Sequence, residues 1–218
     1  MTSNQVFLIG ICGGSGSGKT TFAQKILKNV GPGRISILHM DAYYLGDLPK
    51  NIYTSSNKPN FDHPEAFDWV LLRQHISDLR RGNEVNSPVY DFSTSSRTQL
   101  TELVAATKVV IIEGIFTLFD QEIRNMLDIK CFLHVDSDIR FTRRLHRDVK
   151  ERGRSLESVI AQYYDTVRPM YLKYLDPQRQ YADFVVGEET DVASSILSAR
   201  LRELLSEETH MAHDQVGL

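Results

Sequence analysis

The fold is decided by the stretch "IGICGGSGSGKTTF", residues 9–22. Within it, "GGSGSGKT" fits the pattern G-x-x-x-x-G-K-[S/T], with an apolar, strand-like run before it and the helix-compatible "TTFAQKILKNV" after it. Glycines allow successive backbone N–H groups to turn inward on phosphate oxygens, and the N-terminus of a helix adds a positive dipole. The stretch therefore predicts a nucleotide-phosphate site, the alternative being a glycine-rich turn with an incidental lysine.

The chemistry of such a loop indicates a role for each of its polar residues. Lys19 is expected to reach the β and γ phosphates, and the Thr20 hydroxyl to ligate Mg²⁺. We expect the donor nucleotide to contact Gly13, Gly14, Ser15, Gly16, Ser17, Gly18, Lys19, Thr20 and Thr21.

Continuous apolar, β-rich runs recur along the chain, at 6–12, 34–40, 108–114, 130–135 and 182–186. Because they do not alternate with polar residues, they are typical of strands covered on both faces, and helical stretches separate most of them. We therefore predict an α/β P-loop NTPase fold with a five-stranded parallel sheet, helices on both faces, and a single domain over residues 1–206.

Residues 41–108 form an insert that is far longer than the crossover of about a dozen residues that parallel strands require. Pro64 suits a first helical position, and Gly82 can end that helix. Two extended arms, 87–92 and 97–104, surround the polar tip "STSS". A helix and a hairpin over the sheet edge would form a pocket. The apolar face of the predicted helix consists of Trp69, Leu72, Ile76 and Leu79.

Two acidic residues follow predicted strands, where ligands of open parallel sheets gather. Asp41 follows the second run and is expected to accept the proton of a substrate hydroxyl, whereas Glu113 ends the third run and is expected to hold Mg²⁺ through water. Each could instead be a helix cap or a turn-forming acid. Asp62, just before Pro64, either favours a helix N-terminus or accepts hydrogen bonds from vicinal hydroxyls, with Phe61 against a ring.

The segment "RFTRRLHRDVKERGR", residues 140–154, places Arg140, Arg143, Arg144 and Arg147 on one helical face. We interpret residues 140–156 as a lid whose arginines close over the transferring phosphoryl group, with Gly153 providing flexibility. The alternatives are a solvated basic face neutralised by Asp148 and Glu151, and a nucleic-acid site. The net charge of −3 and the near absence of interleaved aromatic residues, with Phe141 alone in this segment, argue against nucleic acid.

The composition bears on the location of the protein, on the role of its cysteines and on its C-terminal segment. There is no basic, apolar leader and no run of roughly 18 apolar residues, which predicts a cytoplasmic protein without a membrane partner. Cys12 and Cys131 lie inside apolar runs, so they indicate packing rather than a disulfide or zinc site. The polar segment 207–218 is expected to be a flexible tail.

These motifs together resemble the uridine/cytidine kinases of the uridine kinase and phosphoribulokinase group of P-loop kinases. The resemblance runs from Val6 to Val186 and rests on "GGSGSGKTT", "DAYY", "NFDHPEAFD", "PVYDF", "IIEGIF", "RRLHRDVKERGR" and "AQYYDTVRPMY". It implies transfer of the γ-phosphate of ATP or GTP to the 5′-hydroxyl of uridine, cytidine or both. It also implies a homotetramer inhibited by pyrimidine triphosphates.

The resemblance further implies roles for individual residues. Asp41 would meet the 5′-hydroxyl and Asp62 the ribose hydroxyls, while Arg147 and Arg152 would serve phosphates from the lid. With Asp41 and Lys19, Arg147 completes the set expected to act in catalysis. The base would lie near Tyr44, Phe61, Tyr90 and Phe92, and the nucleoside would also be reached by Arg144, Arg154 and Gln162.

The chain departs from the family pattern at two places. Ser95 stands five residues beyond the tyrosine of "PVYDF", where the family usually has a base-contacting His or Tyr, so the choice of base stays open. "GEET" (187–190) replaces a Pro-Arg-Gly type loop near the donor base, so the choice between ATP and GTP also stays open.

Other functions compete with this interpretation. A kinase for a sugar phosphate or pantothenate would share the loop. A GTP-dependent switch would need an N-K-x-D motif, and "NKPN" (57–60) fails at its last position. A nonenzymatic nucleotide sensor would keep the loop but release no ADP in response to an acceptor.

Overall fold

A five-stranded parallel sheet forms the centre of the molecule, as predicted. The computed structural model describes residues 6–214. Each predicted apolar run supplies one strand, with ends shifted by one or two residues. From one edge to the other the strands are β2 (Ile35–His39), β5 (Val109–Gly114), β1 (Phe7–Gly13), β6 (Ile129–Leu133) and β7 (Phe184–Val186).

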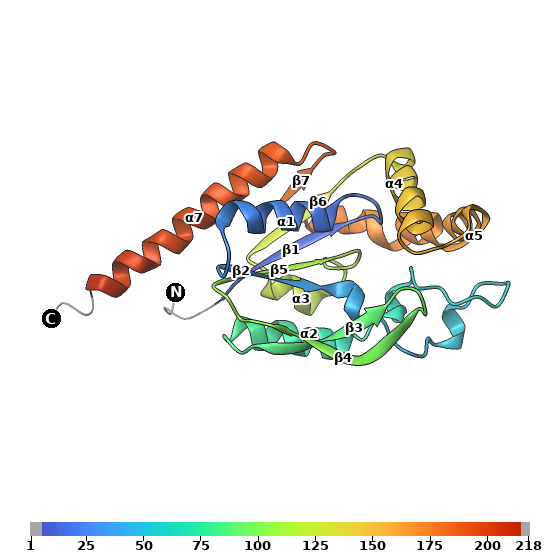
Figure 1. The fold of residues 1–218 in the computed structure, drawn as a ribbon, viewed down its shortest axis with the longest axis horizontal. Helices are drawn as coiled ribbons and strands as arrows, with labels where there is room; N and C mark the ends of the chain where they lie inside the picture. The colour runs from blue at the N-terminus through green and yellow to red at the C-terminus, as the bar shows by residue number, and fades with distance from the viewer. Residues whose placement is uncertain (1–5, 215–218) are drawn as a thin grey trace.

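The strands are apolar throughout because each face of the sheet carries its own core. Side chains of β1 alternate: Leu8 and Cys12 pack in the core on one side, and Ile9 and Ile11 in the core on the other. Figure 1 shows α1 (Lys19–Val30) and α7 (Asp191–Asp214) on one face and α2 (Trp69–Arg80) and α3 (Gln121–Met126) on the other. The two-sided burial fixes the sheet, and its carboxyl edge carries the phosphate loop.

The insert contains the predicted helix and hairpin, but the helix begins later than expected. Pro64 opens only a short 3-10 turn, Pro64–Ala66, and α2 starts at Trp69 behind Asp68, whose Oδ1 accepts from the Leu71 N–H at 3.1 Å. The prediction of a helix from Pro64 was therefore wrong, because a capping carboxylate four residues on sets the start. The turn at Pro64 is η3, and the other short turns before α2 are η1 (Met40–Tyr43) and η2 (Lys50–Ile52).

The other predicted features of the insert are confirmed. Leu72, Ile76 and Leu79 are buried on one face of α2, and Gly82 follows its end with a left-handed φ of 87°. Strands β3 (Val85–Asp91) and β4 (Ser96–Val104) pair antiparallel around the polar tip.

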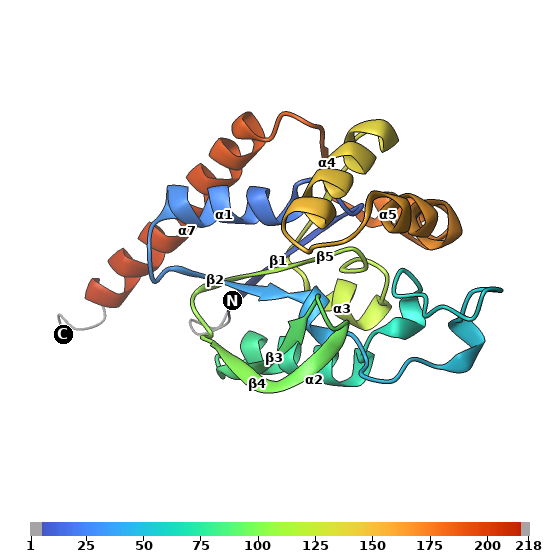
Figure 2. The same ribbon diagram turned by 45° about the vertical axis from the view of Figure 1, so that its right-hand side comes forward.

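The arginine-rich segment forms α4 (Ser137–Lys150), which stands at the carboxyl edge of the sheet beside α5 (Leu156–Gln162) (Figure 2). The helical path then continues with altered winding to Tyr181. Its parts are the π-helical η4 (Tyr163–Val167), α6 (Arg168–Met170), the π-helical η5 (Tyr171–Leu175) and the 3-10 turn η6 (Asp176–Tyr181).

Helix α7 continues to Asp214, into the segment predicted to be a flexible tail, and residues 215–218 lie outside the described residues. Flexibility of that segment stays a prediction. Within residues 6–214, no helix is long and apolar enough to cross a membrane.

Candidate active site

The phosphate loop has the backbone geometry that its glycines predict. Gly16 and Gly18 have left-handed φ values of 80° and 89°, and the Ser17 N–H donates to the Gly14 carbonyl at 3.0 Å. Lys19, 9% exposed, folds back and donates from Nζ to the Gly14 carbonyl at 3.2 Å. Helix α1 therefore begins at the loop with its N-terminus facing the site, as an anion site requires.

Arg140 has a different place from the one that the lid hypothesis gave it. It is 4% exposed, its Nε donates to the Val135 carbonyl at 2.9 Å, and its guanidinium stacks 3.8 Å from the Tyr171 ring centroid. A Cβ built on Gly14 would lie 2.5 Å from its Nη1. Arg140 therefore supports the loop from behind and is not available to close over a phosphoryl group.

Glu113 lies at the end of β5 beside the loop. It is 6% exposed, and its Oε1 contacts Thr20 Oγ1 at 3.1 Å and His39 Nδ1 at 2.7 Å. Burial raises the pKa of Glu113 most strongly, but His39, Lys19 and Thr20 together hold that pKa below its ordinary value. Glu113 is therefore an ionised carboxylate joined to the loop hydroxyl, not a helix cap.

Asp41 lies in η1 at the end of β2, on the same edge of the sheet. Its Oδ1 is buried without a hydrogen-bond partner, and the start of η1 carries no side-chain cap. Burial, and then the charge of Glu113, raise the pKa of Asp41, while Lys19 opposes them. A buried polar atom left unpaired is costly, so a capping role does not account for this arrangement.

A cavity of about 400 Å³ extends from these acids under α4 and over the hairpin. Every residue that the sequence predicts to bind the acceptor lines this cavity, together with Ser15, Lys19, Thr20, Glu113, Arg147 and Arg152. The predicted acceptor set is Asp41, Tyr44, Phe61, Asp62, Tyr90, Phe92, Ser95, Arg144, Arg154 and Gln162.

Aromatic rings from three segments make one wall of this cavity. Tyr44 lies 5.6 Å from Phe61 and 5.2 Å from Tyr90, and Tyr90 lies 5.2 Å from Phe92, between ring centroids. Burial raises the pKa of Tyr90 to about 12, although a hydrogen bond with Ser95 acts to lower it. The wall consists of aromatic rings, two of which carry hydroxyls, and such a wall suits a flat heterocycle.

Asp62 lines the cavity and does not cap a helix. Its Oδ2 accepts from Thr166 Oγ1 at 2.8 Å, while Asp68 caps α2 and His63 caps the turn at Pro64. No α-helix begins at Pro64, so the helix N-terminus that the alternative for Asp62 required is not there, and ribose binding by Asp62 stays a prediction.

The lid arginines divide between the two ends of the cavity. Arg144 Nη1 donates to Ser15 Oγ at 3.0 Å and its Nη2 to Gln162 Oε1 at 3.0 Å. Arg154 also contacts Gln162, and the Arg152 guanidinium lies 4.1 Å from the Phe92 ring centroid. Arg152 thus lies beside a residue predicted to contact the acceptor, although the family resemblance assigns Arg152 to donor phosphates.

Sequence reasoning missed several polar residues at the site, among them Thr166, His39 and Lys58. Thr166 stands one helical turn after Gln162, so its spacing was a usable signal. His39 is the last residue of β2, two positions before Asp41, and its partner Glu113 is far away in sequence. Lys58 lines the cavity from an irregular loop, for which no pattern exists.

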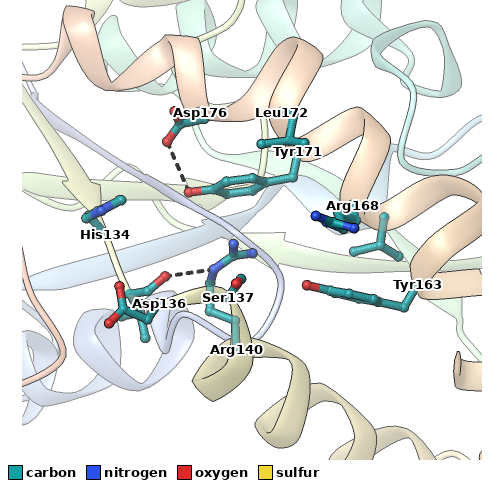
Figure 3. Close-up of a pocket in the computed structure, with 11 residues that line it drawn as sticks. His134, Asp136, Ser137, Arg140, Tyr163, Arg168, Tyr171, Leu172 and Asp176 are labelled. Carbon is teal, nitrogen blue, oxygen red and sulfur yellow. Dashed lines mark hydrogen bonds between the residues drawn. The ribbon is translucent and has the colours of Figure 1, made fainter.

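A second cavity, of about 300 Å³, lies behind the loop between the start of α4 and the helical path after α5 (Figure 3). Arg140 and Tyr171 form part of its wall, and the Tyr171 hydroxyl donates to Asp176 Oδ1 at 3.1 Å. Apart from Arg140, none of the residues predicted from the sequence to bind donor or acceptor lines it. The acceptor hypothesis therefore concerns the larger cavity alone.

A phosphate loop that opens into a cavity lined by carboxylates and aromatic rings is typical of the class of P-loop kinases. The chain belongs to the phosphoribulokinase / uridine kinase family, whose sequence profile matches residues 8–195.

Individual relatives agree with that membership. The chain is 44% identical to a uridine kinase of Deinococcus deserti over 90% of this chain and 95% of that protein. It is 45% identical to uridine-cytidine kinase A of Dictyostelium discoideum over 92% of this chain and 40% of that protein. Among solved structures, a putative fructose transport system kinase from Silicibacter sp. has a TM-score of 0.64 at 20% identity, covering 84% of this chain and 90% of its own, which shows the fold alone.

Proposed function

We propose that this protein is a nucleoside kinase that transfers the γ-phosphate of ATP or GTP to the 5′-hydroxyl of uridine, cytidine or both, as a step of pyrimidine salvage. The observation that carries the proposal is the unpartnered buried oxygen of Asp41, between the phosphate loop and the aromatic wall. The names of the relatives that match nearly the full chain support the same substrate class.

The geometry suggests a separate role in the reaction for each of these residues. Asp41 accepts the proton of the 5′-hydroxyl as that oxygen attacks the γ-phosphorus, and Lys19 and Arg147 bind the phosphoryl oxygens that carry charge in the transition state. Asp62 accepts hydrogen bonds from the ribose hydroxyls, supported by Thr166. Closure of α4 over this arrangement excludes water and favours transfer over hydrolysis.

Thr20 and Glu113 fit a Mg²⁺ ion bound together with the donor phosphates. Their oxygens face each other at 3.1 Å, Glu113 is ionised, and oxygen ligands are those that Mg²⁺ prefers. No group of three acidic, histidine or cysteine side chains among residues 6–206, whose side chains the structure describes, could hold a metal, so phosphates and water would complete the coordination. When bound, the ion would neutralise charge on the phosphates.

We also propose a cytoplasmic homotetramer, from the family resemblance. Apolar side chains exposed on β4 and α7, Leu100, Leu103, Val192 and Ile196, offer surface for self-association. Nucleic acid and membranes are not proposed partners, given the net charge of −3. A single kinase domain over residues 1–206 completes the proposal.

The proposal is tested by measuring ADP or GDP release with ATP or GTP against uridine, cytidine, adenosine, ribose, a sugar phosphate, pantothenate and buffer alone. Release that depends on a pyrimidine nucleoside is expected. Release only with a non-nucleoside would favour the alternative of another kinase of this group, and none with any acceptor would favour a nucleotide sensor.

Asp62→Asn should lower kcat/KM for uridine about 10- to 100-fold, because a charged acceptor for two hydroxyls is lost. The KM for ATP should stay unchanged, and the amide oxygen can still accept from Thr166. Steady-state kinetics with each substrate varied will measure both. The matched control is Glu65→Gln, an exposed acid three residues on. A lower Tm with unaltered kcat/KM would assign Asp62 a structural role instead.

Ser95→His should change the ratio of kcat/KM for uridine to that for cytidine by about tenfold, since an imidazole reaches further into the cavity than a hydroxyl. Ser95 has a φ of 52°, a conformation in which histidine is enriched, so the variant should fold. Asn57→His, at a φ of 55° outside the cavity wall, controls for the backbone. An unmoved ratio would show that position 95 does not select the base.

A further inference from the structure

Asp148 is a carboxylate in the last turn of α4 that is 0% exposed and is surrounded by arginines. Buried charges require partners, and this one has four within 4 Å. The nearest nitrogen–oxygen distances are 2.9 Å to Arg147, 3.4 Å to Arg144, 3.4 Å to Arg152 and 3.6 Å to Arg154.

The same four arginines reach both ends of the cavity. Arg144 contacts Ser15 of the phosphate loop, and Arg147 Nη2 lies 3.5 Å from the same hydroxyl. Arg152 stacks on Phe92 and Arg154 contacts Gln162, both on the acceptor side. One carboxylate thus connects the residues that face the donor with those that face the acceptor.

The charges around Asp148 are far from balanced. Four guanidinium groups against one carboxylate leave a surplus of three positive charges by count over these side chains. Burial, and then the charge of Arg147, hold the pKa of Arg152 below its ordinary value, with Asp148 opposing them. Without Asp148 the arginines would repel one another and move toward solvent.

The contacts of Asp148 are better suited to orienting the arginine side chains than to giving the fold maximal stability. Its Oδ1 accepts from Arg147 Nε and Nη2 at 3.0 and 2.9 Å. Its Oδ2 has no hydrogen bond, and Arg144 Nε, also without one, faces it at 3.4 Å. A pair that served stability alone would close this gap, so the carboxylate acts as a shared anchor.

We propose that Asp148 is the positioning residue of the lid: it holds the four arginines in one arrangement that binds donor phosphates and acceptor together, and so sets the ratio of transfer to hydrolysis. The proposal rests on the proposed function. Asp148 lies behind the arginines and does not line the substrate cavity. It therefore acts through the arginines and touches no reacting atom.

The test compares wild type, Asp148→Asn, Asp148→Glu and the control Glu151→Gln, which removes a charge from the exposed side of the same helix end. For each, uridine phosphorylation and acceptor-independent ATP hydrolysis are measured. Asp148→Asn should raise the ratio of hydrolysis to transfer about tenfold or more, because arginines held loosely admit water. Asp148→Glu should give an intermediate ratio, and Glu151→Gln the wild-type ratio.

A second readout needs no activity. Tryptic cleavage after Arg152 and Arg154, followed by mass spectrometry, should be about tenfold faster in Asp148→Asn than in wild type, because the arginines leave their common anchor. If Asp148→Asn does not fold, Asp148→Glu carries both measurements, with the same directions expected.

Equal losses of transfer and hydrolysis, with cleavage unchanged in the folded fraction, would overturn the positioning role. A wild-type protein that phosphorylates no nucleoside would instead overturn the proposed function, while the cleavage result would still decide whether Asp148 anchors the arginines.

Discussion

Asp41→Asn is expected to lower kcat for nucleoside phosphorylation by about 10²- to 10⁴-fold, because the amide cannot accept the proton of the attacking hydroxyl. ATP binding should stay nearly intact, since Lys19 and the loop backbone remain. Steady-state kinetics and ATP titration calorimetry measure the two effects. Asp47→Asn, an exposed acid in the same insert, is the matched control.

The same substitution should raise Tm at neutral pH. The pKa of Asp41 is higher in the folded protein than its ordinary value, mainly because of burial. Protonation therefore favours the folded state, so that this contribution is present at acidic pH and is lost as pH rises through the folded pKa. Asparagine removes the ionised form that costs stability at neutral pH. Higher stability with lost turnover is the signature of a functional acid, whereas unchanged turnover would remove Asp41 from the mechanism.

Gly16→Ala is expected to lower kcat/KM for ATP by about 10²-fold or more, through loss of phosphate binding. Gly16 has a φ of 80°, and a Cβ there would lie 2.3 Å from the backbone oxygen of Arg140. Arg140 cannot yield, because its side chain is fixed between the loop and Tyr171. The loop must move instead, and its N–H groups then point away from the phosphates.

Gly46→Ala is the matched control for this loop variant, because a Cβ at Gly46 meets no atom within 4 Å. Calorimetric titration with ATP and circular dichroism separate lost binding from lost fold. Wild-type affinity for ATP in Gly16→Ala would contradict the role given to Arg140 as the support of the loop.

The sheet was predictable because its signals are local. A continuous apolar run such as residues 108–114 is explained only by burial on both faces, and the glycines of the loop demand one backbone path. The start of α2 was misplaced because Pro64 and Asp68 both signal a helix start, and sequence alone does not rank them. The π-helical turns between Tyr163 and Leu175 depend on tertiary packing and have no local signature.

The placement of candidate site residues was predictable where the residue type itself indicates a chemical role. Asp41 at a strand end and the aromatic residues of the insert meet in one cavity as expected. Arg140 was misassigned because helical spacing places it with the lid arginines, while its contact with the loop is visible only in three dimensions. The contact of His39 with Glu113 was missed for the same reason.

The central claim is that Asp41 receives the 5′-hydroxyl of a pyrimidine nucleoside while Asp62 holds its ribose. The most direct test is to incubate the protein with ATP, Mg²⁺ and uridine or cytidine, and to identify the product by mass spectrometry and ³¹P NMR. The expected result is one product, the nucleoside 5′-monophosphate, formed with an equal amount of ADP. A 2′- or 3′-phosphate, or ADP formed without any phosphorylated nucleoside, would contradict it.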